Sequence, residues 1–354
     1  MSSQNPSLAT GDLDEQLLRS GALVDAWTRD ALQTSVSPQA ERLKAMLEYH
    51  LGWRGPDLEL LTTPAPAGKK LRPGLVLLTC QAVSGQTTAE ARSAAVAVEL
   101  VHNFSLVHDD IQDRSELRRH RPTLWSLWGM PQGINAGDAL FALAQMVILR
   151  DASPLSARMA SLLNQTTLLL AEGQFLDIAL QQGETPVTLD AYEMMITRKT
   201  GVLFAAASQL GAMAGGANEA QQEAYAAYGR ELGIAFQEQD DLLGVWGSAA
   251  ETGKPDAADI VERKRGLPAA MALSHGDAPE WLRALYAETD GTVDDATVRR
   301  VIEHFDRLDL RATVERRVAE RYRLALHYLD AAGPREPWRG YLAAVCEALV
   351  SRRA

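Results

Sequence analysis

The fold is decided by the stretch LVHDDIQD, residues 106–113, which places carboxylates inside an apolar, helix-patterned segment. Asp109 and Asp113 are spaced i, i+4, so a helix presents both on one face, where like charges repel. A hard divalent cation with oxygen ligands would turn this repulsion into attraction. A second acidic pair, Asp240-Asp241, lies in another helix-patterned segment. Because magnesium also takes phosphate oxygens, two facing acidic helices predict a cage for a diphosphate.

Apolar spacing typical of helices continues along most of the chain. Glycine and proline separate the helical segments, and alternating runs of strand type are nearly absent. Residues 94–101 are apolar almost all round, as in a helix at the centre of a bundle. We therefore predict an all-α fold. The expected helices cover residues 40–48, 72–83, 88–113, 137–150, 155–182, 189–217 and 220–246, and helical patterning continues to the C-terminus.

Length and composition favour one large domain. The 354 residues are within reach of a single all-helical domain, no solenoid repeat appears, and no linker divides the chain. Residues 1–35 are polar, and we expect an N-terminal arm there that is partly disordered. Residues 36–354 are then a single all-α domain. The net charge of −11 argues against a nucleic-acid partner, since no broad basic surface is evident.

Cysteine usage and the lack of a signal segment indicate a cytoplasmic protein. Cys80 and Cys346 have no metal-type spacing and suggest a reducing compartment without structural disulfides. The N-terminus has no apolar signal core. Residues 200–218 carry no charge, but their alanines, glycines and amides make them modestly hydrophobic for a bilayer span. We predict a buried helix there and no transmembrane segment.

Cations gather in two loops near the acidic segments. The run GKKLRP, residues 68–73, puts three cations at a helix start, where backbone N–H groups also favour anions. The run RRHRPT, residues 118–123, follows the first acidic stretch, and His102 lies two helical turns before Asp109. Each feature alone is weak, since basic loops are usually solvated and a lone histidine is usually a core residue. Combined with two acidic helices, they fit a site for two diphosphates.

Eight motifs occur together in a fixed order. They are GKKLRP (68–73), ELVHNFSLVHDDIQD (99–113), RRHRPT (118–123), GDAL (137–140), EGQFLD (172–177), KTGVLF (199–204), FQEQDDLL (236–243) and GKPDAADIVERK (253–264). Over roughly residues 40–350 the chain thereby resembles the trans-isoprenyl diphosphate synthases, the polyprenyl synthetase family, and within it bacterial geranylgeranyl diphosphate synthases. The resemblance implies an isoprenoid synthase fold, a helical bundle around a deep central cavity, usually as a homodimer. It also implies a prenyltransferase that joins isopentenyl diphosphate head to tail to an allylic diphosphate.

The same resemblance assigns roles to individual residues. Asp109, Asp113 and Asp240 are the implied ligands of three Mg2+ ions, for which Mn2+ can substitute. The implied chain-length residues are Phe104 and Ser105. The implied catalytic residues are Asp109, Asp110, Asp113, Lys199, Thr200, Gln237, Asp240 and Asp241. The residues implied to bind the isopentenyl and allylic diphosphates are Lys69, Arg72, His102, Arg118, Arg119, Lys199, Thr200, Gln237, Lys254 and Lys264.

The second acidic motif departs from the family pattern. That pattern usually has aspartate at both ends of five positions, but here the motif reads DDLLG and ends at Gly244. Glycine cannot ligate a metal, so Asp240 and Asp241, with Gln237 one turn before them, are left to serve alone. If the missing carboxylate limits metal binding, Gly244→Asp should lower the magnesium concentration needed for half activity.

Product length is expected to depend on the side chains that precede Asp109. Ser105 and Phe104 lie four and five residues before it, about 6 to 7.5 Å along the helix axis. A ring at Phe104 would set a floor under the growing chain, while Ser105 leaves more room than a second aromatic would. We predict the twenty-carbon geranylgeranyl diphosphate, with the fifteen-carbon farnesyl diphosphate second. The alternative is that Phe104 is simply a core residue.

Two other functions are open on the same fold. A terpene cyclase would ionise an allylic diphosphate without accepting isopentenyl diphosphate, yet it would not need the basic isopentenyl diphosphate site that is present here. A non-catalytic partner subunit of a synthase would be free to lose the first acidic motif, which is intact. The residues of the site therefore favour the synthase over both alternatives.

Overall fold

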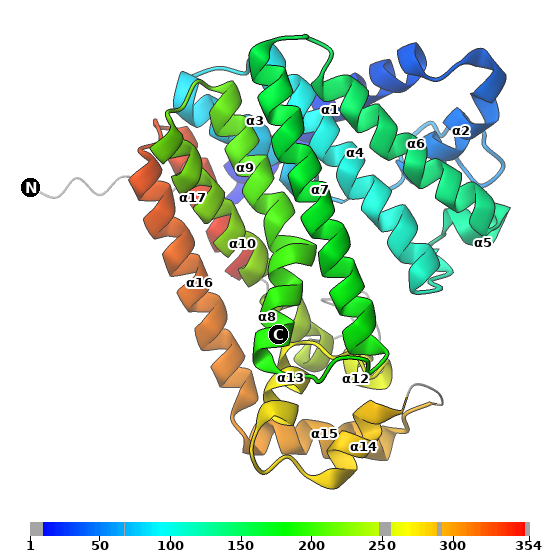
Figure 1. Cartoon of the computed structure of the whole chain (residues 1–354), viewed down its shortest axis with the longest axis vertical. Coiled ribbons are helices and arrows are strands. Elements are labelled where there is room, and N and C mark those ends of the chain that lie inside the picture. Colours follow the sequence, from blue (N-terminus) through cyan, green and yellow to red (C-terminus); the bar gives the residue numbers. More distant parts are fainter. Residues whose placement is uncertain (1–9, 67, 248–255, 289–291, 351–354) are drawn as a thin grey trace, which may run out of the picture. The chain divides into compact units, whose positions relative to one another are not determined.

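A computed structural model describes residues 10–66, 68–247, 256–288 and 292–350 of the chain (Figure 1). Helix follows helix through this part of the chain, and the all-α prediction is confirmed. Two compact units can be distinguished within it. Unit 1 comprises Met1–Asn164, Ala207–Gln222 and Pro334–Tyr341, and unit 2 comprises Gln165–Ala206, Glu223–Gly333 and Leu342–Ala354.

Unit 1 is built around one central helix, α4 (Ala89–Gln112). It begins after Thr88, whose hydroxyl accepts a hydrogen bond from the backbone N–H of Ala91 at 3.1 Å. Every residue from 94 to 101 is buried, as predicted for a helix at the centre of a bundle. α4 packs most extensively against α6 (Met130–Ile148). Apart from α1, the other elements of unit 1 before residue 165 are η1 (Pro38–Ala40), α2 (Glu41–His50), α3 (Leu71–Ser84), β1 (Leu117–Arg118), β2 (Arg121–Pro122), α5 (Leu124–Trp128) and the first part of α7 (Pro154–Gln181).

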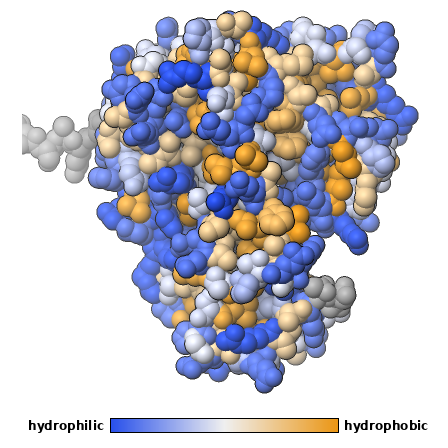
Figure 2. All heavy atoms as spheres, in the orientation of Figure 1, coloured by the Kyte–Doolittle hydropathy of each residue, from blue (hydrophilic) through white to orange (hydrophobic). Residues whose placement is uncertain are grey.

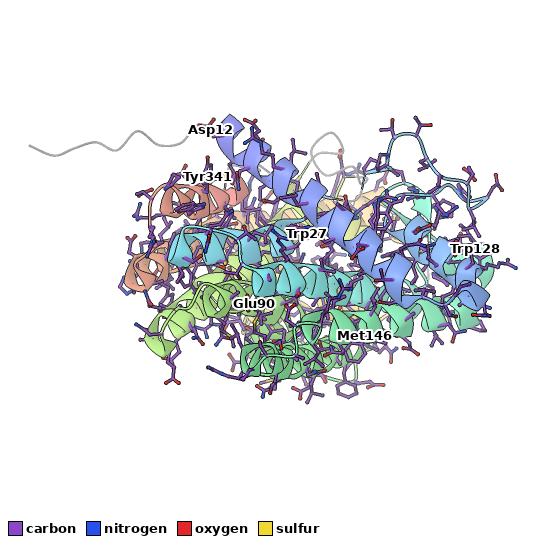
Figure 3. The ribbon with its side chains drawn as sticks, turned by 90° about the horizontal axis from the view of Figure 1, so that it is seen from above. Asp12, Trp27, Glu90, Trp128, Met146 and Tyr341 are labelled. Atoms are coloured by element: carbon purple, nitrogen blue, oxygen red, sulfur yellow. The ribbon has the colours of Figure 1, made fainter. Side chains whose placement is uncertain are left out.

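The first helix corrects the expectation of a partly disordered arm over residues 1–35. Residues 10–35 form α1 (Thr10–Ser35), which lies against α3 and α4 (Figure 3). Most side chains of α1 are polar, so the apolar stripe along the helix is narrow. The polar composition of residues 1–35 therefore masks the helical spacing of its few apolar residues. Residues 1–9 lie outside the described residues. The apolar side chains that α1 buries are Leu13, Leu17, Val24, Ala31 and Leu32.

Unit 2 has an apolar cluster of its own at the end of α10 (Glu219–Trp246). Val245 of that helix packs there with Tyr286 and Phe305, all three of which are buried. The boundaries between the units fall inside α7, α9, α10 and α17, so the single domain over residues 36–354 stays a prediction. The remaining elements with residues in unit 2 are α8 (Leu189–Ile196), η2 (Thr197–Gly201), α9 (Val202–Ala214), α12 (Ala258–Val261), α13 (Leu267–Ser274), α14 (Glu280–Ala287), α15 (Asp295–Arg307), α16 (Leu310–Ala332) and α17 (Trp338–Val350).

The helix predicted over residues 189–217 is interrupted by η2, a single π-helical turn. The uncharged segment after this turn forms α9, in which Leu203, Phe204 and Leu210 are buried, as predicted. Of the helices that the structure describes, none is both long enough and apolar enough to cross a membrane. Because π turns inside helices are frequently found at functional sites, η2 directs attention to Lys199 and Thr200, which it carries.

Candidate active site

The acidic end of α4 divides its carboxylates between two environments. Asp109 and Asp113 lie one turn apart, and the N–H of Asp113 donates to the carbonyl oxygen of Asp109 at 2.8 Å. The side chain of Asp109 is 20% exposed, and Asp113 is exposed. Asp110 is buried and accepts a hydrogen bond from Nε of Arg118 at 2.6 Å. Burial raises the pKa of Asp110 to about 6, although Arg118 acts to lower it. Asp109 and Asp113 are therefore the accessible pair.

The hairpin formed by β1 and β2 holds Arg118 against these acids. Its turn residues, Arg119 and His120, both have left-handed φ values, of 51° and 61°. A two-residue hairpin turn needs positive φ at both positions, which is normally supplied by Asn or Gly. Arg121, opposite Arg118 in the register, fixes the hairpin by donating to the carbonyl oxygen of Tyr49 at 3.1 Å and by lying over its ring. Arg118 of the hairpin therefore contacts the carboxylates at the end of α4, whereas Arg121 contacts Tyr49 of α2.

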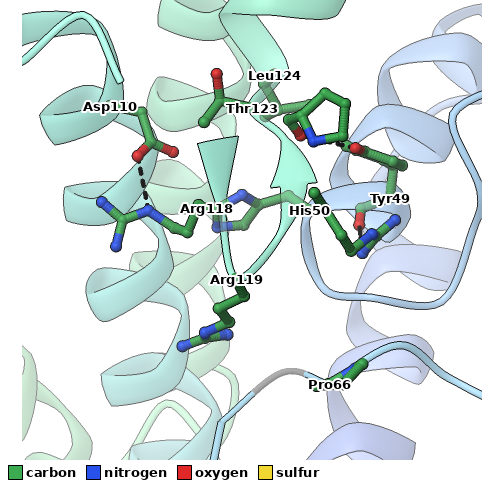
Figure 4. Close-up of a pocket in the computed structure, with 10 residues that line it drawn as sticks. Tyr49, His50, Pro66, Asp110, Arg118, Arg119, Thr123 and Leu124 are labelled. Atoms are coloured by element: carbon green, nitrogen blue, oxygen red, sulfur yellow. Dashed lines mark hydrogen bonds and ion pairs between the residues drawn. The ribbon is translucent and has the colours of Figure 1, made fainter. Parts of the chain in front are cut away.

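A small pocket of about 30 Å³ lies beside the hairpin (Figure 4). His50, Asp110, Arg118 and Arg119 are among the residues that line it. Burial, with the charges of Arg118 and Arg119, lowers the pKa of His50 to about 3, so the imidazole is neutral at physiological pH. Gly68 approaches from the GKKLRP loop with φ +81°, and a Cβ there would lie 2.9 Å from Nη2 of Arg119. Glycine thus permits the loop and the hairpin to meet.

The two adjacent lysines of the GKKLRP loop have opposite environments. The side chain of Lys70 is 6% exposed, and its Nζ lies 2.6 Å from Oδ1 of Asp25 and 3.4 Å from Oε1 of Glu99. Although burial lowers the pKa of Lys70, these two carboxylates raise it overall. The side chain of Lys69 is 81% exposed, with Asp14 3.8 Å away. Lys70 therefore anchors the loop to α1 and α4, and Lys69 is accessible to a ligand.

Arg72 and His102 form a second contact between the loop and α4. Nη1 of Arg72 lies 3.4 Å from Nε2 of His102. Burial, together with the charges of Arg72 and Arg119, holds the pKa of His102 well below its ordinary value. The imidazole is therefore neutral and can accept a hydrogen bond from the guanidinium of Arg72. His102 thereby orients Arg72 without competing for an anion.

The ring of Phe104, one of the two implied chain-length residues, is packed against its neighbours. Its centroid lies 5.4 Å from that of Phe141 on α6 and 5.0 Å from that of His108. Ser105 donates its hydroxyl to the carbonyl oxygen of His102 at 2.8 Å. A Cβ at Gly137 would overlap the imidazole of His108, so the glycine of GDAL lets α6 approach α4 here. Phe141 thus supports the ring of Phe104.

In unit 2, the π turn η2 lies against α7 where the EGQFLD run begins. A Cβ on Gly173 would overlap the backbone of Lys199, so only glycine allows this approach. One turn further along α7, Oδ2 of Asp177 accepts a hydrogen bond from Nζ of Lys199 at 2.5 Å. EGQFLD therefore supplies both the space and the carboxylate that position Lys199.

Thr200 begins a hydrogen-bonded chain that runs into α10. Its hydroxyl donates to Oε1 of Gln237 at 2.9 Å, and Nε2 of Gln237 donates to Oδ1 of Asp241 at 3.0 Å. The hydroxyl of Tyr192 and the backbone N–H of Leu267 also donate to Asp241, at 2.7 and 2.8 Å. Asp241 is buried and held by protein donors, which favours a positioning role for it.

Lys264 connects Asp241 to a third carboxylate. Its Nζ lies 3.4 Å from Oδ1 of Asp241 and 3.2 Å from Oδ2 of Asp259. Although burial lowers the pKa of Lys264, the two carboxylates raise it well above its ordinary value. Asp240 precedes Asp241 on α10 and is half-buried. Lys254, which the sequence predicts to bind substrate, lies outside the described residues.

The donor chemistry of the acidic residues fits magnesium. Asp109 and Asp113 offer two carboxylates one turn apart, and magnesium prefers such oxygen ligands and completes its shell with water and phosphate. Within the described residues, no group of three or more histidine, cysteine, aspartate or glutamate side chains is arranged to hold a metal ion by itself. Carboxylates that share a metal with a bound diphosphate do not need such a group.

Several supporting residues were not identified from the sequence. Asp177 was part of a quoted motif but had no assigned role, and Phe141 lies beyond every motif. Asp25 lies in the segment for which the sequence predicts an arm, so its contact with Lys70 has no sequence signal. Tyr192 and Asp259 reach the site only through the tertiary fold. Of these, only Asp177 and Asp259 carried a signal, because each lies within a matching run.

Comparison with known proteins places this site in context. A model of the polyprenyl synthetase family matches residues 59–305. A (2E,6E)-farnesyl diphosphate synthase of Mycobacterium tuberculosis is 43% identical over 234 residues, which are 66% of this chain and 64% of the relative. A geranylgeranyl diphosphate synthase of the same species is 40% identical over 273 residues, 75% of this chain and 77% of the relative. The matched region thus spans less than two thirds of the length of the farnesyl diphosphate synthase.

Solved structures agree with the sequence comparison. A polyprenyl synthetase from Streptomyces coelicolor has a TM-score of 0.87 and 32% identity, covering 95% of this chain and 98% of its own. A polyprenyl synthase from Caulobacter crescentus, complexed with calcium and isoprenyl diphosphate, has a TM-score of 0.79 and 27% identity, covering 96% and 98%. The relatives thus share the fold of this chain over almost its whole length.

The two lysines of the GKKLRP loop give a matched test of stability. We expect Lys70→Met to lower the free energy of unfolding by about 3 kcal/mol or more, because it leaves buried Glu99 and part-buried Asp25 without their cation. Lys69→Met should change it by less than about 0.5 kcal/mol, since the side chain is exposed. Urea unfolding followed by circular dichroism measures both. Equal stabilities of the two variants would contradict the assignment of Lys70 as the anchor.

Proposed function

Because the chain belongs to the polyprenyl synthetase family, we propose that it is a short-chain prenyltransferase that joins isopentenyl diphosphate head to tail to an allylic diphosphate. The observation that carries this proposal is the pairing of an accessible carboxylate pair, Asp109 and Asp113, with an oriented basic set on the same unit. A site for one diphosphate would need only one of these sets. Two sets of opposite charge suit a metal-bound diphosphate and a second diphosphate held by cations.

The carboxylates are assigned to the allylic diphosphate. Asp109, Asp113 and Asp240 would hold divalent metal ions, with magnesium as the proposed metal and manganese as a substitute. When bound, such ions stabilise the charge of the leaving diphosphate as the allylic cation forms. Lys199 and Lys264 offer cations positioned by neighbouring carboxylates, and Lys254 is proposed to add another. The family relative that contains calcium and isoprenyl diphosphate supports a divalent metal here.

The basic set is assigned to isopentenyl diphosphate. Exposed Lys69 and the oriented guanidinium of Arg72 would bind its phosphate oxygens by charge-assisted hydrogen bonds. Arg119 is proposed to bind with them, while Arg118 acts mainly on Asp109 and Asp110. Binding at this set places the double bond against the cation by proximity and orientation.

The reacting region is proposed to be bounded by Thr200 and Gln237 and by apolar side chains. The hydroxyl of Thr200 is fixed on Gln237, and Gln237 is fixed on Asp241, so these polar groups do not rotate freely. Apolar walls exclude water, which would otherwise quench the carbocation. The released diphosphate is the proposed base for the final proton, and no dedicated side-chain base is assigned.

The proposed product is geranylgeranyl diphosphate, with farnesyl diphosphate second. Relatives of both kinds occur at about 40% identity, so the similarity alone does not choose between them. The choice of product is supported by the single ring of Phe104, five residues before Asp109 on α4. This ring contacts Phe141, and its neighbour in sequence is the small Ser105. One supported ring leaves more length than two adjacent rings would.

We also propose a homodimer that uses the exposed face of α6. Apolar side chains of this helix are exposed, among them Ile134 at 47% and Met146 at 56%. Figure 2 shows apolar residues at the surface among polar ones on the face that it draws. Exposed large apolar side chains grouped on one helix are typical of an interaction surface. A cytoplasmic location is proposed with it, because the thiols of Cys80 and Cys346 are both free and buried.

The activity can be tested directly with labelled substrate. Radiolabelled isopentenyl diphosphate and an allylic diphosphate, with magnesium, should yield a longer prenyl diphosphate, and chelator should abolish the reaction. Asp109→Asn should reduce turnover by about 100-fold or more, because it removes a charged metal ligand. Glu116→Gln, an exposed change near the same helix end, should be neutral. Near-normal turnover in Asp109→Asn would refute the metal assignment, and a hydrocarbon or alcohol formed from the allylic substrate alone would indicate a cyclase.

The length of the product tests the proposed role of the rings of Phe104 and Phe141. Phe104→Ala should shift the products to longer chains because it removes the floor, and Phe141→Ala should do so more weakly because it removes only the support. Phe175→Ala, an exposed aromatic on α7, is the control and should leave the distribution unchanged. Chromatography of the dephosphorylated products measures chain length. Unchanged lengths in Phe104→Ala would place the floor elsewhere.

The proposed dimer surface can be tested with charge. The double substitution Ile134→Glu and Met146→Glu should convert a dimer to a monomer, because paired copies would bury uncompensated carboxylates. Leu18→Glu, at a side chain of α1 that is 74% exposed, is the matched control. Light scattering after gel filtration gives the mass of each variant. A dimer that survives the double substitution would rule out this face.

A further inference from the structure

His50, the last residue of α2, lines the small pocket beside the hairpin. Figure 4 shows its imidazole beside the side chain of Arg118. Nε2 of this imidazole is buried, and no group in the part of the chain that the structure describes forms a hydrogen bond with it. A buried polar atom without a partner is uncommon in proteins and requires an explanation. His50 lies outside all eight motifs, so no role that those motifs imply accounts for it.

The other ring nitrogen of His50 has a partner on α4. The side chain of Asn103 forms a hydrogen bond with His50, and this bond uses Nδ1 because Nε2 has no partner within the described residues. Nδ2 of Asn103 donates to the carbonyl oxygen of Glu99 at 2.8 Å and to its Oε1 at 3.0 Å. The amide oxygen of Asn103 is therefore the acceptor, and Nδ1 of His50 carries the proton. A neutral imidazole with its proton on Nδ1 has its lone pair on Nε2.

The pocket surrounds this lone pair with cations. Arg118 and Arg119 line the pocket together with His50, and its volume is about 30 Å³. A cavity of about 10 to 15 Å³ already holds one water, provided that roughly two to four polar groups bind it. Burial and the two guanidinium charges hold the pKa of His50 low, so the imidazole stays neutral and its lone pair stays available. The pocket therefore has the room and the polar groups that a buried water needs.

Arg119 differs from the other two arginines of the hairpin in its partners. Nε of Arg118 lies 2.6 Å from a carboxylate oxygen of Asp110, and Arg121 donates to backbone carbonyl oxygens at 3.1 and 2.6 Å. Of the described residues, none forms a hydrogen bond or an ion pair with Arg119, on which nearby carboxylates act through charge alone. The residue is exposed. Its guanidinium is thus accessible to a ligand, and it needs a further group to fix its direction.

We propose that His50 is a positioning residue for Arg119: a water in the pocket donates to Nε2 of His50 and accepts an N–H of Arg119. The guanidinium is thereby directed at the diphosphate of isopentenyl diphosphate, so this inference rests on the proposed function. Glu99, which accepts from Asn103, also lies 3.4 Å from Nζ of Lys70. One buried network then anchors the GKKLRP loop and directs the arginine of the hairpin.

Two substitutions of His50 separate this role from a merely structural one. His50→Asn keeps an amide where Nδ1 lies and can still bond to Asn103, but its side chain is too short to reach the pocket. His50→Gln places an amide oxygen near the position of Nε2 and gives up the bond to Asn103. A structural role would make His50→Asn the milder change, and the proposed role makes His50→Gln the milder one. His327→Asn, at an exposed histidine of α16, is the control.

The condensation assay gives kcat and the KM for each diphosphate. We expect His50→Asn to raise the KM for isopentenyl diphosphate by about tenfold, because Arg119 loses the hydrogen bond that directs it. The kcat and the KM for the allylic diphosphate should stay close to those of the parent, since only binding of the second diphosphate is weakened. His50→Gln should retain most of the parental affinity, and His327→Asn should match the parent.

A double-mutant cycle tests whether His50 acts through Arg119. In an Arg119→Met background, His50→Asn should have little further effect on the KM for isopentenyl diphosphate, because the two residues form one network. A parental KM in His50→Asn would overturn the inference, and so would an equal rise in KM with and without Arg119. If His50→Asn does not fold, His50→Phe, which keeps the shape of the ring without an acceptor, takes its place with the same expected result. A parent protein that forms no longer prenyl diphosphate would instead overturn the proposed function, so the two failures are distinguishable.

Discussion

Compensation of buried negative charge is the constraint on which the rest of the structure depends. An ionised carboxylate removed from water is costly unless a partner restores what the solvent supplied. Asp110 has Arg118, Glu99 has Lys70, and Asp241 and Asp259 share Lys264. The carboxylates that remain accessible, those of Asp109 and Asp113, are the ones at the end of α4. Cations of the fold thus compensate the buried acids, whereas Asp109 and Asp113 keep exposed surface at the end of α4.

Glycines leave the space that neighbouring charged and backbone groups of the site occupy. Gly173 admits the backbone of Lys199, Gly244 admits the carboxylate of Asp259, and Gly266 admits that of Asp241, where a Cβ would lie 2.8 Å from Oδ2. At each position a methyl group would displace a charged or backbone group of the site. These three glycines therefore matter because they lack a side chain, which leaves space for the neighbouring group.

Much of the fold could be predicted from the sequence, because helical periodicity and breakers are local signals. The expected segment 88–113 corresponds closely to α4, and the segment 220–246 to α10. α1 was missed because its apolar stripe is narrow. The π turn has no local sequence signal that we recognised, and its close neighbour Gly173 lies on another helix. Local patterns cannot report a neighbour that is distant in sequence.

For the site, too, local sequence signals could be predicted and contacts between distant residues could not. Motifs predict which runs of residues form the site, but they could not rank neighbouring residues within a run. Lys69 and Lys70 are equivalent in sequence, and only Asp25 on α1 shows that Lys70 is the buried one. Asp240 and Asp241 are likewise adjacent, and burial distinguishes them: Asp241 is buried among four donors, whereas Asp240 is half-buried. The contribution of each residue depends on contacts that only the fold supplies.

The π turn η2 has a consequence for how this helix tolerates change in length. A π turn holds one residue more than the corresponding α-helical turn. Removing one residue from Thr197–Gly201 would therefore regularise the helix while leaving the packed faces of α8 and α9 in register with their neighbours. Lys199 and Thr200 would lose their displacement from the helical path, although the bundle would keep its shape. An alignment of relatives with and without this turn would show a one-residue gap at this position. Chains on the two sides of that gap would differ in the local backbone and share the same packed core.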